Sequence, residues 1–531
     1  MYYKTEAYLG TPFAGKILHD NGLVPIYVSD NPVLNAQHLV LEAAKAYRYG
    51  LPYHVALAAV TSAPAFYMGL GNRLGKIKPG FDGDVVVWDS DPLQFGAAPV
   101  QVWIDGTAQF DDPVELDKPV SNPIVPDPKL EEIPNDPVPM KDVIFTGVSR
   151  ILYKDADQVA SKEPLAVVVT KGKITCIGTC ATDIQSASTA GTHSTIHLQN
   201  GHLTHAFTAF GGLLGLMEID QEASTSNGPD AGYNSFSRGV DGLALDTKKL
   251  RAAHRSGVTR AISAPKASSA GISRLGTSAG FRTAATTVLD EDAVWQDDIA
   301  VHYSLEIFEA KNPITPSMSA AVGALRAKLL GAATSNSTST DPLSEAAFLR
   351  KVVNGAMPLV IHVHSADFIA AALKIKAAVD EVASSPIRLV IHGGAESHIL
   401  AAELAAADVG VILSPFLSYR LSWDERRALT GAPLTNGTAL DRLVAAGVKV
   451  GIGIEEDWLV RQLGIDAAIA FRNGSGKLSI KEALALVDAN LYEILDVGET
   501  GEDFLVWDGS PMDVSGQIRG VGSAGVVDVV V

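Results

Sequence analysis

The stretch Gly22-Leu-Val-Pro-Ile-Tyr-Val-Ser-Asp30 is an apolar segment that ends in a carboxylate. Near the end of the chain, Gly447-Val-Lys-Val-Gly-Ile-Gly-Ile-Glu455 has the same form. The leading glycines (22 and 447) and the closing carboxylates (30 and 455) are both 425 positions apart. This pair of segments decides the fold, because each is followed by the same series of elements.

A helix pattern comes next in both places, at Ala56-Leu-Ala-Ala-Val and at Ala483-Leu-Ala-Leu-Val. The strands Val85-Val-Val-Trp88-Asp-Ser-Asp-Pro92 and Phe504-Leu-Val-Trp507-Asp-Gly-Ser-Pro511 then follow in the same order. Three blocks in one order indicate a duplication, and self-similarity at so long a period indicates repeated domains, not a solenoid.

The overall composition excludes several classes of protein. At 531 residues the chain can bury more than one core, and its net charge of −18 without any Lys/Arg-rich run argues against a nucleic-acid partner. Neither a signal-peptide core nor an apolar span of transmembrane length is present, so as written the chain is expected to be soluble and cytoplasmic. Cys176 and Cys180 are too few for a disulfide framework; two small buried residues beside a turn are favoured, and a single local disulfide is the alternative.

Changes in composition divide the chain. Prolines crowd the segment 112–140, which predicts a linker. Short strands separated by glycines and charges follow it, and strand–helix alternation begins near residue 200, which predicts a parallel sheet and leaves room for a (β/α)8 barrel. The five predicted parts are residues 1–111, 112–140 (the linker), 141–200, 201–495 (the barrel) and 496–531.

In a (β/α) barrel the reactive groups lie at the C-terminal ends of the strands. The predicted strand Leu359-Val-Ile-His-Val-His364 ends in two imidazoles, and a period of two places His362 and His364 on one face, where they can bind one metal ion. The alternative is that one histidine caps the following helix and the other is a core residue with its hydrogen bonds satisfied.

Two further strand ends carry polar groups. His392 ends its strand, and Glu396 and His398 open the next helix, where Glu396 can simply complement the helix dipole. Glu455 and Glu456 follow a buried strand directly, and a carboxylate there can bind a metal, act as a general base or begin a helix.

The run from Ala56 through Gly75-Lys-Ile-Lys-Pro-Gly80-Phe-Asp-Gly-Asp84 to Trp88 resembles the C-terminal signature of the amidohydrolase superfamily of metal-dependent hydrolases. Leu198-Gln-Asn-Gly-His-Leu203 resembles the opening of the same family. The order, a family C-terminus followed by a whole family member, is similar to the back part of fungal two-unit amidohydrolase-like proteins, filed with carbohydrate esterase family nine.

This resemblance implies a (β/α)8 barrel with a small β-sandwich formed by 141–200 and 496–531. It implies that residues 1–111 are the end of a first unit, with the last barrel strand at 23–28 and a catalytic aspartate at Asp30. In the second unit His364 and His392 match the fifth- and sixth-strand histidines, and Glu455 replaces the eighth-strand aspartate.

The family's first strand ends in His-x-His, but the matching positions here are Gly211 and Leu213, which have no ligand atoms in their side chains. The resemblance therefore implies a degenerate site with at most one divalent metal, such as zinc, on His364, His392 and a carboxylate, with His362 as a further candidate ligand. It implies a hydrolase of carbon–nitrogen bonds, acting on a small molecule such as a cyclic amide or an N-acetyl amino sugar. The alternatives are an inactive barrel that serves as a scaffold or partner half, and a truncated product of a longer protein. Exposed strands also predict that copies of the chain can pair as a homo-oligomer.

Overall fold

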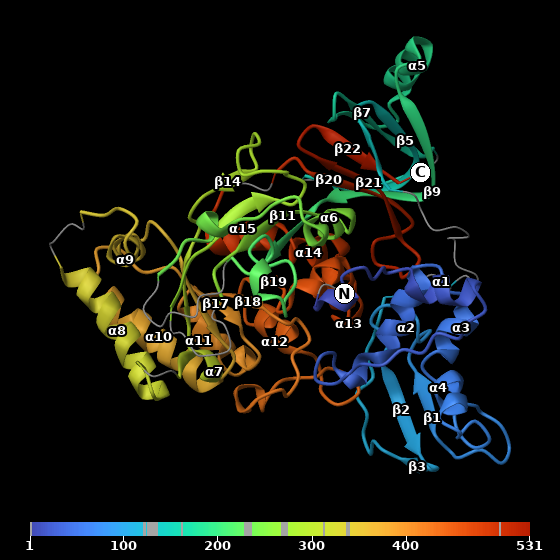
Figure 1. Ribbon diagram of the computed structural model, residues 1–531, viewed down its shortest axis with the longest axis horizontal. Helices are drawn as coiled ribbons and strands as arrows, with labels where there is room; N and C mark the ends of the chain where they lie inside the picture. Colours follow the sequence, from blue (N-terminus) through green and yellow to red (C-terminus); the bar gives the residue numbers. More distant parts are fainter. Residues whose placement is uncertain are drawn as a thin grey trace.

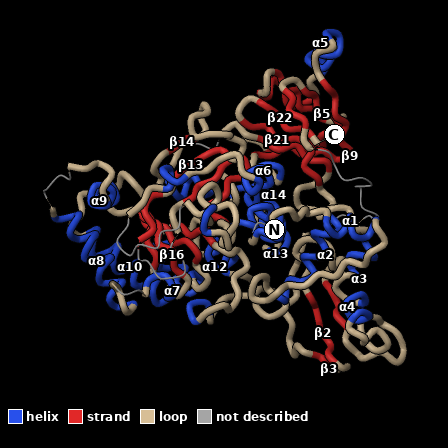
Figure 2. The backbone as a smooth tube through the Cα atoms, viewed as in Figure 1, coloured by secondary structure: helices blue, strands red, loops and turns tan. Residues whose placement is uncertain are grey.

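The computed structural model describes residues 3–119, 124, 136–154, 156–160, 163–227, 236–266, 274–311, 314–335, 340–498 and 501–530. The chain forms an N-terminal segment, a β-rich part and a mixed α/β part, which lie against one another (Figures 1 and 2). In the described residues no helix has both the length and the apolar character that crossing a membrane requires.

The N-terminal segment is mostly helical and ends in a small sheet. Its elements are the helices α1 (Ala14–Asp20), α2 (Leu39–Arg48), α3 (Tyr53–Ala58) and α4 (Ser62–Tyr67) and the strands β1 (Val85–Trp88), β2 (Pro99–Ile104) and β3 (Thr107–Ala108). The predicted strands near 85–89 and 100–104 form, but the strand predicted at 23–28 does not. No described strand pairs with residues 23–28, and an isolated extended segment has no ladder of hydrogen bonds to stabilise it.

The N-terminal segment shares its core with the α/β part. Leu51 and Phe95 are buried in the same hydrophobic cluster as the barrel-type strands. Gln94 accepts a hydrogen bond from the amide of Val514 at 2.9 Å, and Gln517 donates one to the carbonyl of Arg48 at 2.9 Å. Residues 3–111 are therefore packed onto the rest of the chain and are not merely tethered to it.

A nine-stranded sheet combines strands from residues 138–205 with strands from residues 504–529. Its strands, in spatial order, are β4 (Val138–Met140), β22 (Val526–Val529), β21 (Gln517–Ser523), β20 (Phe504–Asp508), β9 (Ser194–His205), β5 (Val143–Leu152), β7 (Leu165–Thr170) and β8 (Lys173–Gly178), with β6 (Gln158–Val159) beside β5. The long strand β9 pairs with β5 on one side and with β20 on the other, so segments more than 300 residues apart are joined.

Two further sheets form the α/β part. A six-stranded sheet has the order β12 (Arg274–Thr277), β15 (Val301–Ser304), β16 (Leu359–Val363), β17 (Leu389–Gly393), β18 (Gly410–Leu413) and β19 (Val450–Ile452). A four-stranded sheet has the order β10 (Phe207–Phe210), β11 (Val258–Ser263), β13 (Ala279–Arg282) and β14 (Val294–Gln296). The five strands from β15 to β19 are parallel and form a curled half of a barrel, as expected for buried strands connected through helices.

The strands β12 and β13 depart from the predicted pattern. β13 is antiparallel to β11, and β12 is antiparallel to β15. Only ten residues (264–273) separate β11 from β12, fewer than a parallel crossover needs. The expectation of a purely parallel sheet was wrong at this position, because the connection is too short to carry a crossover helix.

Helices cover the outside of these sheets (Figure 2). They are α6 (Lys248–Arg255), α7 (Ile307–Ala310), α8 (Met318–Thr334), α9 (Glu345–Val353), α10 (Ala366–Asp380), α11 (Ala401–Ala406), α12 (Ala439–Ala445), α13 (Leu463–Asn473), α14 (Ile480–Ala485) and α15 (Ala489–Leu495), while α5 (Ala181–Ala190) projects from the nine-stranded sheet.

Two smaller predictions concern the connections. Most of the linker predicted over 112–140 lies outside the described residues, although the amide of Val114 bonds the carbonyl of Pro433. Cys176 and Cys180 form a disulfide, so the local bridge is observed and the favoured pair of small buried thiols was wrong.

Replacement of Leu51 by alanine tests whether the N-terminal segment belongs to the common core. Leu51 is fully buried in the shared cluster, so Leu51→Ala should lower the free energy of unfolding by about 2–5 kcal/mol, measured by urea denaturation with two optical probes. The control Leu23→Ala removes a side chain that is 57% exposed and should change stability by no more than about 0.5 kcal/mol. An unchanged main transition in Leu51→Ala would show that the segment does not stabilise the rest.

Candidate functional site

The C-terminal ends of the parallel strands bring four histidines together. Register places His362 of β16 directly beside His392 of β17 and beside Ser304 of β15, and His302 lies two residues before Ser304 on the same face. The rings of His362 and His392 have centroids 5.0 Å apart, and those of His362 and His364 are 5.2 Å apart. The predicted convergence of His362, His364 and His392 is therefore present.

Glu455, which follows strand β19, completes this group. His362 Nε2 lies 4.0 Å from Glu455 Oε2, and the Ser414 hydroxyl donates a hydrogen bond to the same oxygen at 3.3 Å. Donor atoms of His362, His364 and Glu455 all lie within 4.8 Å of one another. Among the described residues, this is the group of histidine and carboxylate side chains arranged closely enough to share one ion.

Glu309 fixes the orientation of His362. Its carboxylate lies 3.0 Å from His362 Nδ1, while Nε2 has no hydrogen-bond partner among the described residues. A metal-binding histidine typically donates its second ring N–H to a carboxylate in this way. His364 Nδ1 and His392 Nε2 are also buried without a hydrogen-bond partner in the described part of the chain.

The pKa of His362 is shifted in the opposite direction to the pKa values of the neighbouring His364 and His302. Burial acts to lower the pKa of His362, but attraction and hydrogen bonding to Glu309, together with attraction to Glu455, outweigh it and raise this pKa to about 9. Burial, reinforced by the charge of His362, lowers the pKa of His364 to about 4 and that of His302 to about 3. Without an ion, His362 is therefore cationic at neutral pH and the other two are neutral.

A lysine ammonium shares the site. Lys266 Nζ lies 3.9 Å from Glu455 Oε1. Burial acts to lower the pKa of Lys266, but the charges of Glu455, Glu456 and Glu309 outweigh it and raise the pKa. Lys266, Glu309 and Glu455 line, together with His302, His362 and His392, a cavity of about 40 Å³, which has room for an ion or a water molecule but not for a substrate.

A larger cavity lies on the other side of Glu455. It measures about 410 Å³, and its walls include Glu455, Glu456 and Glu425 on one side and residues 32–35 of the N-terminal segment on the other. Burial raises the pKa of Glu425 to about 7 and, against the attraction of Lys266, raises that of Glu456 to about 7. Glu425 Oε1 is 3.9 Å from His364 Nδ1, so a carboxyl group that titrates near neutrality lies next to the histidines.

Gly211 and Gly212, at the end of the first barrel-type strand, leave no room for ligands. A Cβ atom added to Gly211 would come within 2.8 Å of His392 Nε2, and one added to Gly212 within 2.2 Å of Asp457 Oδ1. Both glycines also have positive φ angles (87° and 65°), which side chains rarely adopt. A side chain at either glycine would therefore clash, and Leu213, the other position that the family resemblance aligns with a metal ligand, has no ligand atom in its side chain.

Three of the predicted site residues lie elsewhere. Asp30 is exposed in the loop before Pro32, with a φ of 50°, so the strand predicted to end at Asp30 does not form, while its catalytic role stays a prediction. Glu396 is fully buried, where it accepts hydrogen bonds from Arg427 and from the amide of Ala366 and so supports the start of α10. His398 belongs to the short turn Ser397–Leu400 and does not line the cavity beside Glu455.

Comparisons with known proteins agree with this geometry. The sequence profile of the Amidohydrolase family matches residues 34–108. The chain is 52% identical over 538 residues to the amidohydrolase tasK of Hapsidospora irregularis, an alignment that covers 94% of this chain and 54% of tasK. The chain is therefore similar in sequence to amidohydrolases.

A solved structure supports the fold assignment. The amidohydrolase of Thermotoga maritima MSB8 superposes with a TM-score of 0.57 at 18% identity, over 71% of this chain and 97% of that one. At this identity the likeness shows the fold alone. The chain spans about half the length of the tasK relative, so the activity of that whole protein is not carried over here.

Four residues of the candidate site were missed by the reasoning from sequence. Lys266 follows β11 and Glu309 follows β15, so an inspection of every strand end would have found both residues. His302 lies within β15, and the same inspection would have drawn attention to it. Glu425 lies in a loop far from any strand end and carries no local signal.

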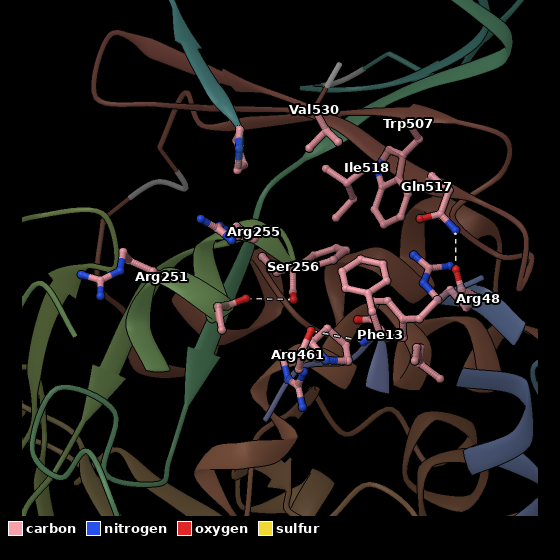
Figure 3. A pocket seen from close by; sticks show the side chains of 18 of the residues that line it. Phe13, Arg48, Arg251, Arg255, Ser256, Arg461, Trp507, Gln517, Ile518 and Val530 are labelled. Carbon is pink, nitrogen blue, oxygen red and sulfur yellow. Dashed lines mark hydrogen bonds between the residues drawn. The ribbon is translucent and has the colours of Figure 1, made fainter. Parts of the chain in front are cut away.

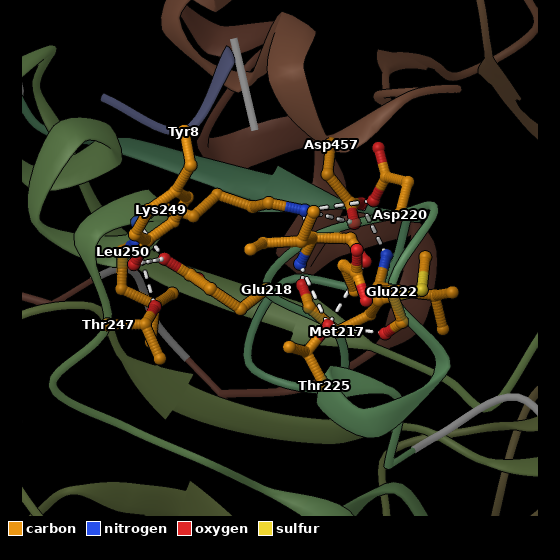
Figure 4. Close-up of polar contacts among 12 residues, drawn as sticks. Tyr8, Met217, Glu218, Asp220, Glu222, Thr225, Thr247, Lys249, Leu250 and Asp457 are labelled. Atoms are coloured by element: carbon orange, nitrogen blue, oxygen red, sulfur yellow. Dashed lines mark hydrogen bonds and ion pairs between the residues drawn. The ribbon is translucent and has the colours of Figure 1, made fainter. Parts of the chain in front are cut away.

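Lys249 forms a buried ion cluster behind the glycines (Figure 4). Its ammonium lies 3.1 Å from Asp220 and 3.2 Å from Asp457, and it donates to the carbonyl of Met217. Asp457 in turn accepts a hydrogen bond from the amide of Leu213. The cluster therefore fastens the end of β10 to the segment that carries Glu455.

Removal of the Lys249 charge should destabilise the chain strongly. Lys249→Met leaves Asp220 and Asp457 buried without a cation, which should cost about 3–5 kcal/mol at pH 7 in urea denaturation. The deficit should shrink as the pH falls toward 4, because buried unpaired carboxyl groups have raised pKa values and become neutral first. The control Lys449→Met removes an exposed partner of Glu493 and should change stability by less than about 1 kcal/mol; an equal effect of both variants would contradict the assignment.

Proposed function

We propose that this chain is a metal-dependent hydrolase of carbon–nitrogen bonds, with one divalent ion held by His362, His364 and Glu455. The observation that carries the proposal is the convergence of their three donor atoms within 4.8 Å, with His362 Nδ1 on Glu309 and Nε2 left free. The donor set fits zinc, which prefers imidazole and carboxylate ligands. His362, His364 and Glu455 would hold such an ion through two imidazole nitrogens and one carboxylate oxygen.

The chain's own residues can supply the proton transfers. A divalent ion supplies Lewis-acid chemistry when it is bound. Glu425, with a pKa near 7, lies at the junction of the histidines and the 410 Å³ cavity, where it can accept a proton and then donate it to a leaving nitrogen. That volume is typical of small-molecule sites, and the family resemblance suggests cyclic amides or N-acetyl amino sugars as substrates.

We also infer the architecture that this activity requires. The two barrel-type sheets would close into one eight-stranded ring, since the amide of Ile454 bonds the carbonyl of Phe210 and since Ser278, between β12 and β13, bonds residues Ile299 and Ala300. The nine-stranded sheet would correspond to the small sandwich domain of the second unit, and residues 1–111 to the end of a first unit. Self-association of the chain would use the exposed edge strand β3 and the exposed side chains of Val86 and Val87.

A scaffold role is the second candidate, and two observations favour it. Gly211 and Gly212 leave no room for a ligand side chain at the end of β10, and the Lys266 ammonium already supplies positive charge to Glu455. The cavity walled by the N-terminal segment would then bind a molecule without converting it. The two candidates differ in whether the protein takes up metal and turns over substrate.

Metal analysis separates the two roles. After zinc loading and dialysis, wild-type protein should retain about one equivalent of zinc by mass spectrometry, and His362→Ala should retain less than a tenth. The control His398→Ala removes a histidine outside the cavity and should keep the ion.

Glu425→Gln should also retain the zinc ion, but should lower kcat by about 10²–10⁴-fold on any amide that the wild type hydrolyses. Retention of less than a tenth of an equivalent of zinc by the wild-type protein would contradict the hydrolase proposal and favour the scaffold role.

Zinc uptake should depend on the proton of His362. Because the pKa of this residue is raised to about 9 and a ligand must be deprotonated, the apparent association constant should rise by about tenfold for each pH unit between 6 and 8 and level off above 9. His364 and Glu455 contribute no such slope, since the pKa of each is lowered. Competition with a fluorescent zinc chelator measures the constant, and a flat profile from pH 6 to 8 would contradict the assignment of His362 as a ligand.

A further inference from the structure

A second cavity lies where the N-terminal segment meets the rest of the chain (Figure 3). It measures about 550 Å³ and is enclosed by residues 9–13, helix α6, the start of α13 and the strands β20 and β21. It shares no lining residue with the cavities on either side of Glu455. It is therefore a separate site, and its volume falls within the range of small-molecule pockets.

The charge around this cavity is opposite to that of the whole protein. The chain carries 60 acidic and 42 basic residues, yet the cavity is lined by five basic side chains and no carboxylate. The basic residues are Arg48, Lys248, Arg251, Arg255 and Arg461. Such a concentration of one sign in a concave site raises the local concentration of ligands of the other sign.

Two of these arginines are available to a ligand. The guanidinium group of Arg461 makes no hydrogen bond or ion pair with another described residue, and its Nε atom is buried. Arg255 pairs with Asp136, but both side chains are largely exposed, and exposed ion pairs contribute only about 0–1 kcal/mol. By contrast, Arg48 donates to the carbonyl of Val514 and lies over the ring of Phe95, so it belongs to the wall.

The remaining lining is apolar. Figure 3 shows Phe13 below the cavity and Trp507, Ile518 and Val530 above it, with Arg255 and Arg461 beside the rings. The indole N–H of Trp507 is already bonded to Thr204 at 3.1 Å, which leaves the ring as an apolar surface. A ligand that fits must combine an apolar body with an anionic headgroup.

We propose that this cavity binds an amphipathic organic anion, with its headgroup on Arg461 and Arg255 and its body between Phe13 and Trp507. Because the walls come from both the N-terminal segment and the second half of the chain, such a ligand strengthens the contact between them. A ligand that binds only the folded protein raises its stability as its concentration rises.

Alkyl probes of one chain length and different headgroups test this proposal on the full chain. Below their micellar concentrations, laurate and dodecyl phosphate should bind with a stoichiometry of one in titration calorimetry, and should raise the thermal midpoint, whereas dodecyltrimethylammonium should do neither. The tighter of the two anions distinguishes a carboxylate from a phosphate ligand. Absence of saturable binding by both anions, or equal binding of the cationic probe, would overturn the proposal.

Matched variants locate the site. Arg461→Met keeps a long side chain without charge and should weaken the binding of the preferred anion by at least about tenfold, while Arg326→Met, an exposed arginine on α8, should leave it unchanged. If Arg461→Met fails to fold, Arg255→Met provides the same test, since its side chain is 49% exposed and its loss does not disturb the core. Binding that is unaltered by both Arg461→Met and Arg255→Met would place the anion elsewhere and overturn the assignment.

Discussion

The site depends on the parallel register of β15, β16 and β17. Register sets Ser304, His362 and His392 side by side, and a shift of one residue would turn His362 away from its neighbours. The same register fixes the position of Glu309, which follows β15 and holds the imidazole of His362. Hydrogen bonds between the backbones of buried strands therefore determine which side chains can share an ion.

Much of this could be predicted from the sequence. The apolar runs before His362, His392 and Glu455 predict buried strands, and the period of two predicts that His362 and His364 share a face; all of these features form. The strand predicted to end at Asp30 does not form because a strand needs neighbours: its segment resembles a barrel strand, but no described strand pairs with it. Glu425 could not be placed because its position depends on a long connection between elements, where the sequence has no periodicity to indicate direction.

The N-terminal segment shows how context changes the use of a repeated sequence. Trp88 and Trp507 occupy equivalent positions of the duplicated blocks, but β20 joins a nine-stranded sheet whereas β1 pairs only within a three-stranded one. Residues 32–42 then form a wall of the cavity next to Glu455, and residues 9–13 form a wall of the cavity that holds Arg461. The N-terminal segment, whose sequence resembles the end of a barrel unit, thus completes two cavities whose other walls belong to the second half of the chain.

Lys266 and a divalent ion compete for the same negative charge. The ammonium offsets one unit of charge on Glu455 and its neighbours, while an ion with two positive charges would offset more but would have to displace both this ammonium and the proton of His362. Two like charges a few ångströms apart in a buried site repel strongly. If such an ion binds, Lys266 would have to move away from Glu455, which its long side chain permits. A side chain at position 211 or 212, by contrast, would meet His392 or Asp457. The charge around the carboxylates could therefore be balanced in two ways, by the Lys266 ammonium or by a bound ion.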